Sequence, residues 1–132
     1  MNKLICTLLF IGLFSNIIAQ ENKDMNNFDS SFAHTVYFWF KDDTNENDKD
    51  HFEKSLKKFL SNSEYAKTKF IGTAPKASRD VVDGSFTYSL IVTFKSAEAQ
   101  EAYQNEAAHL VFIEECSHLW DKVIVYDSNG IN

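Results

Sequence analysis

The segment from Phe32 to Phe40, FAHTVYFWF, limits the possible folds more than any other part of the sequence. It is dense in aromatic and β-branched residues, which is typical of a β-strand. Successive side chains of a strand point to opposite faces of a sheet, and here both faces are largely apolar. They consist of His34, Val36, Phe38 and Phe40 on one side and of Thr35, Tyr37 and Trp39 on the other. Each large aromatic left in water forfeits roughly 1.5–3 kcal/mol of burial, so both faces need a cover.

Apolar spacing along the rest of the chain predicts further strands and helices. Alternation predicts strands at 68–73, 86–94 and 123–126. Helical spacing predicts helices over 52–60, from a cap at Ser96 through Tyr103, and, after a break at 105–108, over 112–120. The order β-α-β-β-α-β predicts an α+β, ferredoxin-like domain with a four-stranded antiparallel sheet.

A domain of this plan has helices on one face of its sheet, and the other face stays open. Because both faces of the strand at 32–40 are apolar, the open face would expose large aromatic side chains. An exposed apolar surface of this kind indicates a partner, and two-fold pairing is the commonest assembly of identical chains. The sequence therefore predicts a homodimer in which two open sheet faces pack together.

The charge of the chain excludes two classes of partner. Its 132 residues suit one globular domain, with 19 acidic and 13 basic residues and a formal net charge of −6. Nucleic acid and anionic membrane surfaces attract basic patches, and the sequence has no basic patch of useful size. Neither is expected to be a partner.

The first 19 residues have the pattern of an export signal. Lys3 supplies the positive start, an apolar run follows from Leu4 to Phe14, and Ala19 precedes a cleavage site at Gln20. The apolar run is too short to span a bilayer, so no membrane anchor is expected. We predict an exported protein, periplasmic or secreted, with residues 20–31 as a disordered leader. The domain would then occupy residues 32–127, with a tail at 128–132.

Local motifs for metal, cofactor and nucleophile chemistry are missing from the sequence. Removal of the signal takes Cys6 away and leaves Cys116 alone, so no intrachain disulfide is expected. The four histidines show no His-x-x-x-His or His-Glu-x-x-His spacing, and no Cys-x-x-Cys or Gly-x-Ser-x-Gly occurs. We therefore expect neither a metal nor a cofactor.

Four stretches of the sequence carry a resemblance to a known family. They are HTVYFWFK at 34–41, IVTFKS at 91–96 followed by Ala102-Tyr103, AAHLVF at 107–112 and WDKVIVYD at 120–127. In this order and spacing they resemble the stress-responsive A/B-barrel (Dabb) family, a branch of the dimeric α+β barrels. The resemblance covers about residues 33–127. It implies a homodimer with apposed open sheet faces and a pocket between the sheet and the helices.

The resemblance also implies candidate site residues. Polyketide cyclases of this family close linear chains by aldol chemistry without a cofactor or metal. Carried over by position, His34, Tyr103 and His109 match their pocket, with Tyr103 and His109 as the catalytic candidates. The third-strand histidine of the cyclases is replaced by Tyr88, which would join the pocket. A phenol titrates near pH 10 and is a poor base, so enzyme activity stays an open question.

Three functions remain open at this point. The first is binding of a small hydrophobic molecule in a pocket lined by His34, Tyr88, Tyr103 and His109. The second is a structural or stress-protective homodimer whose own aromatic side chains fill that pocket. The third is a cofactor-independent, cyclase-like lyase. Haem binding through His109 is a more distant alternative, because haem occurs elsewhere among dimeric α+β barrels and no motif here favours it.

Overall fold

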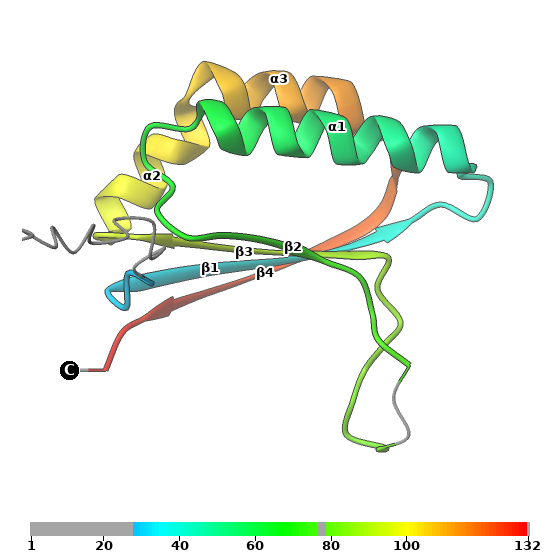
Figure 1. Cartoon of the computed structure of the whole chain (residues 1–132), viewed down its shortest axis with the longest axis horizontal. Helices are drawn as coiled ribbons and strands as arrows, with labels where there is room; N and C mark the ends of the chain where they lie inside the picture. The colour runs from blue at the N-terminus through cyan, green and yellow to red at the C-terminus, as the bar shows by residue number, and fades with distance from the viewer. Residues whose placement is uncertain (1–27, 77–78, 132) are drawn as a thin grey trace, which may run out of the picture.

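A computed structural model of the chain describes residues 28–76 and 79–131. Two layers make up the domain: a four-stranded sheet and a layer of helices on one of its faces (Figure 1). The predicted signal at 1–19 and most of the predicted leader at 20–31 lie outside the described residues. None of the helices within the described ranges combines the length and apolarity needed to cross a membrane.

The sheet is antiparallel, with the strand order β2-β3-β1-β4. Its strands are β1 (Phe32–Phe40), β2 (Lys69–Gly72), β3 (Tyr88–Phe94) and β4 (Trp120–Asn129). The helices are α1 (Glu46–Asn62), α2 (Ala97–Asn105) and α3 (Ala107–Cys116), with a 3₁₀ turn η1 at Ser117–Leu119. The predicted ferredoxin-like α+β fold is confirmed, and the second helical region is divided at Glu106 into α2 and α3.

Helix α1 forms where the sequence supplies both a cap and an apolar face. Asn45 accepts hydrogen bonds from the backbone N–H groups of Asn47 and Asp48, and the Asp48 carboxylate accepts one from the Asn45 N–H. This capping box satisfies donors that the first turn otherwise leaves unpaired. The buried apolar face of the helix consists of Phe52, Leu56, Phe59 and Leu60. These side chains join the buried face of the sheet in one core.

Strand β1 lies in the interior of the sheet, between β3 and β4. Its side chains at Phe32, His34, Val36 and Phe38 are buried, whereas those at Tyr37 and Trp39 are half-buried. The alternation confirms the strand prediction and identifies the helix-covered face. Within the described residues, no helix covers the face that carries Tyr37 and Trp39 (Figure 1).

The open face carries a group of contacting aromatic rings. The ring of Tyr37 lies 4.9 Å from that of Phe86, 6.3 Å from that of Tyr126 and 6.4 Å from that of Trp39 between centroids. The Lys122 ammonium lies 4.5 Å from the centroid of the Trp39 ring. We call Tyr37, Trp39, Phe86 and Tyr126 the open-face cluster. Tyr126 is 59% exposed, so this apolar surface is only partly shielded within one chain.

Three strands differ in length from their predictions. Strand β2 is Lys69–Gly72 instead of 68–73. Strand β4 runs from Trp120 to Asn129 instead of 123–126, because β1 supplies a hydrogen-bonding ladder along its whole length, with Asn129 opposite Phe32. The polar residues at 121–122 and 127–129 show no apolar alternation, so the sequence pattern did not predict the full length of β4. Strand β3 begins at Tyr88 instead of Phe86, and the Phe86 ring packs against that of Tyr37 just before the strand starts.

Candidate functional site

A cavity of about 150 Å³ lies between the helix-covered face of the sheet and helix α3. We call it the sheet–helix cavity. Its wall combines apolar side chains with two imidazoles, one phenol and one amide: His34, Val36, Phe38, Phe59, Leu90, Tyr103, Gln104, His109, Phe112, Ile113, Trp120, Val123 and Val125. Three of the four side chains predicted to form a pocket therefore meet here: His34, Tyr103 and His109.

His34 is held by a carboxylate from the neighbouring strand. The register of β1 and β4 places His34 opposite Asp127, and the imidazole Nδ1 lies 2.6 Å from Asp127 Oδ1. Because a carboxylate accepts hydrogen bonds, Nδ1 is the nitrogen that carries the proton in this bond. The pair fixes the ring orientation, and in the neutral ring it leaves Nε2 with the lone pair. Only 3% of the residue is exposed, so this lone pair belongs to a largely dry environment.

His109 is oriented by the backbone at the division between α2 and α3. The Gln104 carbonyl lies 2.9 Å from its Nδ1, and a carbonyl can only accept, so Nδ1 donates and Nε2 keeps the lone pair. Burial lowers the pKa of His109, and the bond to the Gln104 carbonyl opposes part of that effect. The neighbouring His34 lowers the pKa of His109 further, while Glu106 raises it. The imidazole is therefore a neutral acceptor at pH 7.

Tyr103 places a phenol between the two imidazoles. Its ring lies 5.9 Å from that of His34 and 5.4 Å from that of His109 between centroids. Burial, together with the charge of Glu106, raises the pKa of Tyr103 above its ordinary value. The phenol therefore stays protonated at neutral pH. It can act as a hydrogen-bond donor or a general acid, not as a base.

Tyr88 does not line the sheet–helix cavity, in contrast to the prediction. Its ring packs in the core, 4.8 Å from that of Phe52 and 5.4 Å from that of Phe40 between centroids. Its hydroxyl donates to Glu53 Oε1 at 3.1 Å. Burial and this bond raise the pKa of Tyr88 to about 12. The register of β3 and the direction of its ring carry the hydroxyl toward α1, away from Tyr103 and His109.

Asp127 is a site residue that the sequence reasoning missed. The prediction assigned the residues after Tyr126 to a domain end and tail, whereas Asp127 is paired within β4 and bonded to His34. The signal was present in the alternation Val123, Val125, Asp127, which places the carboxylate on the same face as two apolar side chains. Gln100 is a neighbour of this pair, with its Nε2 3.5 Å from the same His34 nitrogen, but two donors cannot form a hydrogen bond, so Asp127 is the partner of Nδ1.

The arrangement can bind a small acceptor-bearing molecule and exchange a proton with it. Tyr103 offers a donor, and the neutral His109 imidazole offers a lone pair at Nε2 within an apolar wall. In general acid–base catalysis, a neutral imidazole can accept a proton and a nearby hydroxyl can donate one. Across residues 28–76 and 79–131, no group of three or more metal-ligating side chains is gathered in one place.

The depressed pKa of His109 gives a testable dependence of stability on pH. Below the unfolded-state pKa, the unfolded chain binds a proton that the folded chain resists, so acidification lowers the free energy of unfolding. We expect the change His109→Gln to flatten the loss of stability between pH 7 and pH 5, measured by urea denaturation. His51→Gln, at an exposed position of α1, is the matched control and should keep the wild-type slope. Equal slopes for all three proteins would contradict this account of His109, which faces His34, Tyr103 and Glu106.

Proteins of known structure share this fold. A protein from Arabidopsis thaliana is 24% identical, with a TM-score of 0.65 over 76% of this chain and 96% of that chain. The hydroxynitrile lyase from Passiflora edulis is 21% identical, with a TM-score of 0.67 over 79% of this chain and 95% of that chain. A dimeric ferredoxin-like protein of unknown function from Thermobifida fusca is 13% identical, with a TM-score of 0.62 and coverages of 75% and 90%. A comparison with curated proteins finds no match.

Family membership rests on a match along most of the chain. The family model described as the Stress responsive A/B Barrel Domain, Dabb, matches residues 32–129. The matched region begins at the first residue of β1 and ends at the last residue of β4. It therefore contains the whole sheet, the helices on its covered face and the residues around the sheet–helix cavity. The chain belongs to the stress-responsive A/B-barrel (Dabb) family.

Proposed function

We propose that this protein binds a small hydrophobic molecule with one hydrogen-bond acceptor, such as a carbonyl group, in the sheet–helix cavity. The observation that carries the proposal is the convergence of His34, Tyr103 and His109 on one apolar cavity. Burying such polar groups costs free energy unless they find partners, and a ligand acceptor would supply one for the Tyr103 hydroxyl.

The size of the cavity narrows the class of ligand. An apolar cavity of about 150 Å³ is large enough for a molecule the size of benzene. A linear polyketide would need considerably more room. The cyclase-like alternative also lacks a histidine at Tyr88, whose hydroxyl is bonded to Glu53. The favoured ligand is therefore a single-ring aromatic or a short aliphatic carbonyl compound.

A second candidate function is a cofactor-independent lyase acting on such a ligand. The observation that favours it is the neutral His109, with its Nε2 lone pair, beside a protonated Tyr103. Such a pair can remove a proton from a bound molecule and donate one to a developing oxyanion. The Passiflora protein with this fold is named a hydroxynitrile lyase, which supports a lyase as a candidate function for a chain of this fold.

Two further features belong to the same proposal. The open-face cluster supports a homodimer, since a second copy would cover the aromatic surface, and the similar Thermobifida fusca protein is described as dimeric. The pattern at 1–19 supports export, with the mature chain starting at Gln20. A structural homodimer without a ligand is the competing interpretation.

The change Tyr103→Phe tests the proposed site. Acetophenone, a single ring with one carbonyl acceptor, is expected to raise the melting temperature of the wild-type protein by mass action. Loss of the phenol donor should weaken binding by roughly 2- to 13-fold, since one hydrogen bond contributes about 0.5–1.5 kcal/mol. Tyr88→Phe removes a hydroxyl outside the cavity and should leave the affinity unchanged. If neither acetophenone nor other small carbonyl compounds shift the melting temperature, the structural homodimer is favoured instead.

A further inference from the structure

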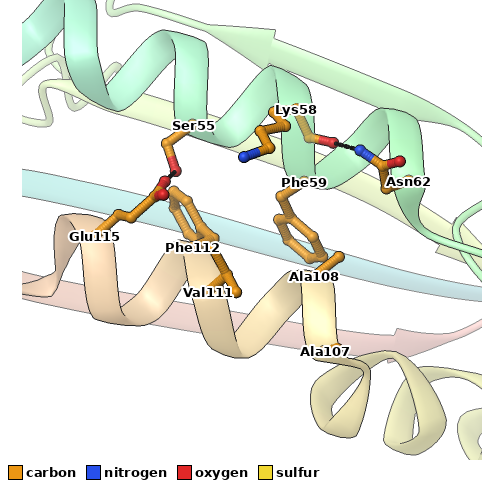
Figure 2. A pocket seen from close by; sticks show the side chains of 9 residues that line it. All are labelled: Ser55, Lys58, Phe59, Asn62, Ala107, Ala108, Val111, Phe112 and Glu115. Atoms are coloured by element: carbon orange, nitrogen blue, oxygen red, sulfur yellow. Dashed lines mark hydrogen bonds between the residues drawn. The ribbon is translucent and has the colours of Figure 1, made fainter.

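A second hollow lies directly behind the sheet–helix cavity, between helices α1 and α3. This interhelical groove has a volume of about 280 Å³. Figure 2 shows the residues that line it: Ser55, Lys58, Phe59, Asn62, Ala107, Ala108, Val111, Phe112 and Glu115. Two of them, Phe59 and Phe112, also line the sheet–helix cavity. The two hollows therefore share a wall made of these two side chains.

The shared wall is a pair of stacked rings. Phe59 and Phe112 have centroids 5.5 Å apart and planes inclined by 15°, and each residue is 3% exposed. On the cavity side, the Phe59 ring lies 5.1 Å from that of Tyr103 and 5.2 Å from that of His109. On the same side, the Phe112 ring lies 5.8 Å from that of Trp120. Phe59 and Phe112 are the two residues that line both the histidine-lined cavity and the groove.

The groove suits the uncharged hydrocarbon chain of a ligand. Its walls on α3 are small or aliphatic at Ala107, Ala108 and Val111, and the phenyl rings form its floor (Figure 2). At one end, the Ser55 hydroxyl donates to Glu115 Oε2 at 2.5 Å and ties α1 to α3. The polar groups are therefore concentrated near the ends and rim. A hydrocarbon chain would meet mostly carbon in the middle.

We propose that Phe59 and Phe112 determine ligand size: they restrict the cavity to a single ring and exclude a longer ligand from the groove. This inference rests on the proposed function, because it concerns the ligand of the same cavity. Ligand pockets ordinarily have volumes of about 300–1,000 Å³, above that of the sheet–helix cavity alone. Joined through the wall, the two hollows would enter that range. Thinning the wall should therefore extend the accepted ligands toward longer apolar ones.

A matched pair of ligands tests this wall. Acetophenone carries the ring and the carbonyl, and 4′-butylacetophenone adds four carbons in line with the ring. Wild-type protein should gain no affinity from the butyl group. The change Phe112→Ala should open the wall and make 4′-butylacetophenone bind at least about 10-fold tighter than acetophenone, since each buried methylene contributes about fourfold. Isothermal titration calorimetry gives the ratio of the two dissociation constants for each protein.

Three further variants separate the possible outcomes. Phe112→Leu is the milder change, to be used if Phe112→Ala does not fold, and it should move the ratio in the same direction. Phe52→Leu removes a neighbouring core ring that lines neither hollow and should keep the wild-type ratio. Ala107→Phe, at an exposed position on the groove wall, should abolish the gain of the Phe112 variant without weakening acetophenone binding.

The results distinguish this inference from the function on which it rests. Acetophenone that fails to bind the wild-type protein overturns the proposed ligand class and this inference with it. If acetophenone binds but the ratio of the two dissociation constants is unchanged in both Phe112 variants, the proposed role of the wall is overturned and the proposed ligand class stands. A butyl gain already present in the wild-type protein also overturns it, because the wall would then exclude nothing. If Phe112→Ala still binds 4′-butylacetophenone more tightly when Ala107→Phe is added, the butyl group does not enter the groove, and the inference is overturned.

Discussion

Replacing Phe52 by alanine is expected to lower the free energy of unfolding by about 3–5 kcal/mol. The side chain is fully buried on α1. Its ring lies 4.8 Å from that of Tyr88, 4.9 Å from that of Phe40 and 5.2 Å from that of Phe38 between centroids. Because these neighbours belong to two strands, they cannot collapse into the space without moving the sheet. A total stability of about 5–15 kcal/mol is usual, so the variant would lose much of its margin.

Urea denaturation followed by circular dichroism measures this effect. Phe52→Leu keeps most of the volume and should cost less than about 1.5 kcal/mol. Leu110→Ala removes a side chain that is 56% exposed on α3, and it should stay within about 0.5 kcal/mol of the wild type. A Phe52→Ala protein as stable as Leu110→Ala would mean that this ring does not join α1 to the sheet.

Replacing Tyr37 by aspartate is expected to convert the proposed homodimer into monomers. Tyr37 contacts all three other members of the open-face cluster, so its side chain lies at the centre of the surface that a second copy would cover. An unpaired carboxylate buried in an apolar interface costs several kcal/mol, which should raise the dissociation constant about 10³-fold or more. The side chain points away from the helix-covered core, so the fold of each chain should survive.

Sedimentation equilibrium across a range of protein concentrations checks this expectation. Leu110→Asp introduces the same charge on the helical side of the molecule and should leave the dimer intact. The wild-type melting temperature should rise with protein concentration, whereas that of Tyr37→Asp should not. A Tyr37→Asp protein that still sediments as a dimer would place the interface elsewhere.

The parts of the fold predicted well from sequence are those in which local pattern and burial agree. The aromatic and β-branched residues of Phe32–Phe40 predict β1, and the apolar spacing of Phe52, Leu56 and Phe59 predicts α1. One face of each element enters the core. The resemblance predicts His34, Tyr103 and His109 as site residues, and the structure brings these three side chains to one cavity. Their elements are adjacent in space, so positions carried over from a family with this fold land in the same cavity.

The remaining features depend on contacts between distant residues. Strand β4 is an exposed edge strand that ends in the polar residues 127–129, and only its ladder with β1 makes residues as far as Asn129 part of the sheet. The same ladder brings Asp127 to His34, although 93 residues separate them. Tyr88 leaves the predicted site because its hydroxyl meets Glu53 on α1, 35 residues away. No local pattern contains such pairings.

Sequence alone determined the order of strands and helices, the two-sided apolar character of β1 and the residue types available for chemistry. These depend on period and composition, which are properties of neighbours along the chain. Tertiary structure decided which side chains share a cavity, which nitrogen of each histidine holds the lone pair, and that two phenyl rings separate that cavity from a groove. Those outcomes follow from packing across elements, because register and side-chain direction are set only when the sheet and helices meet.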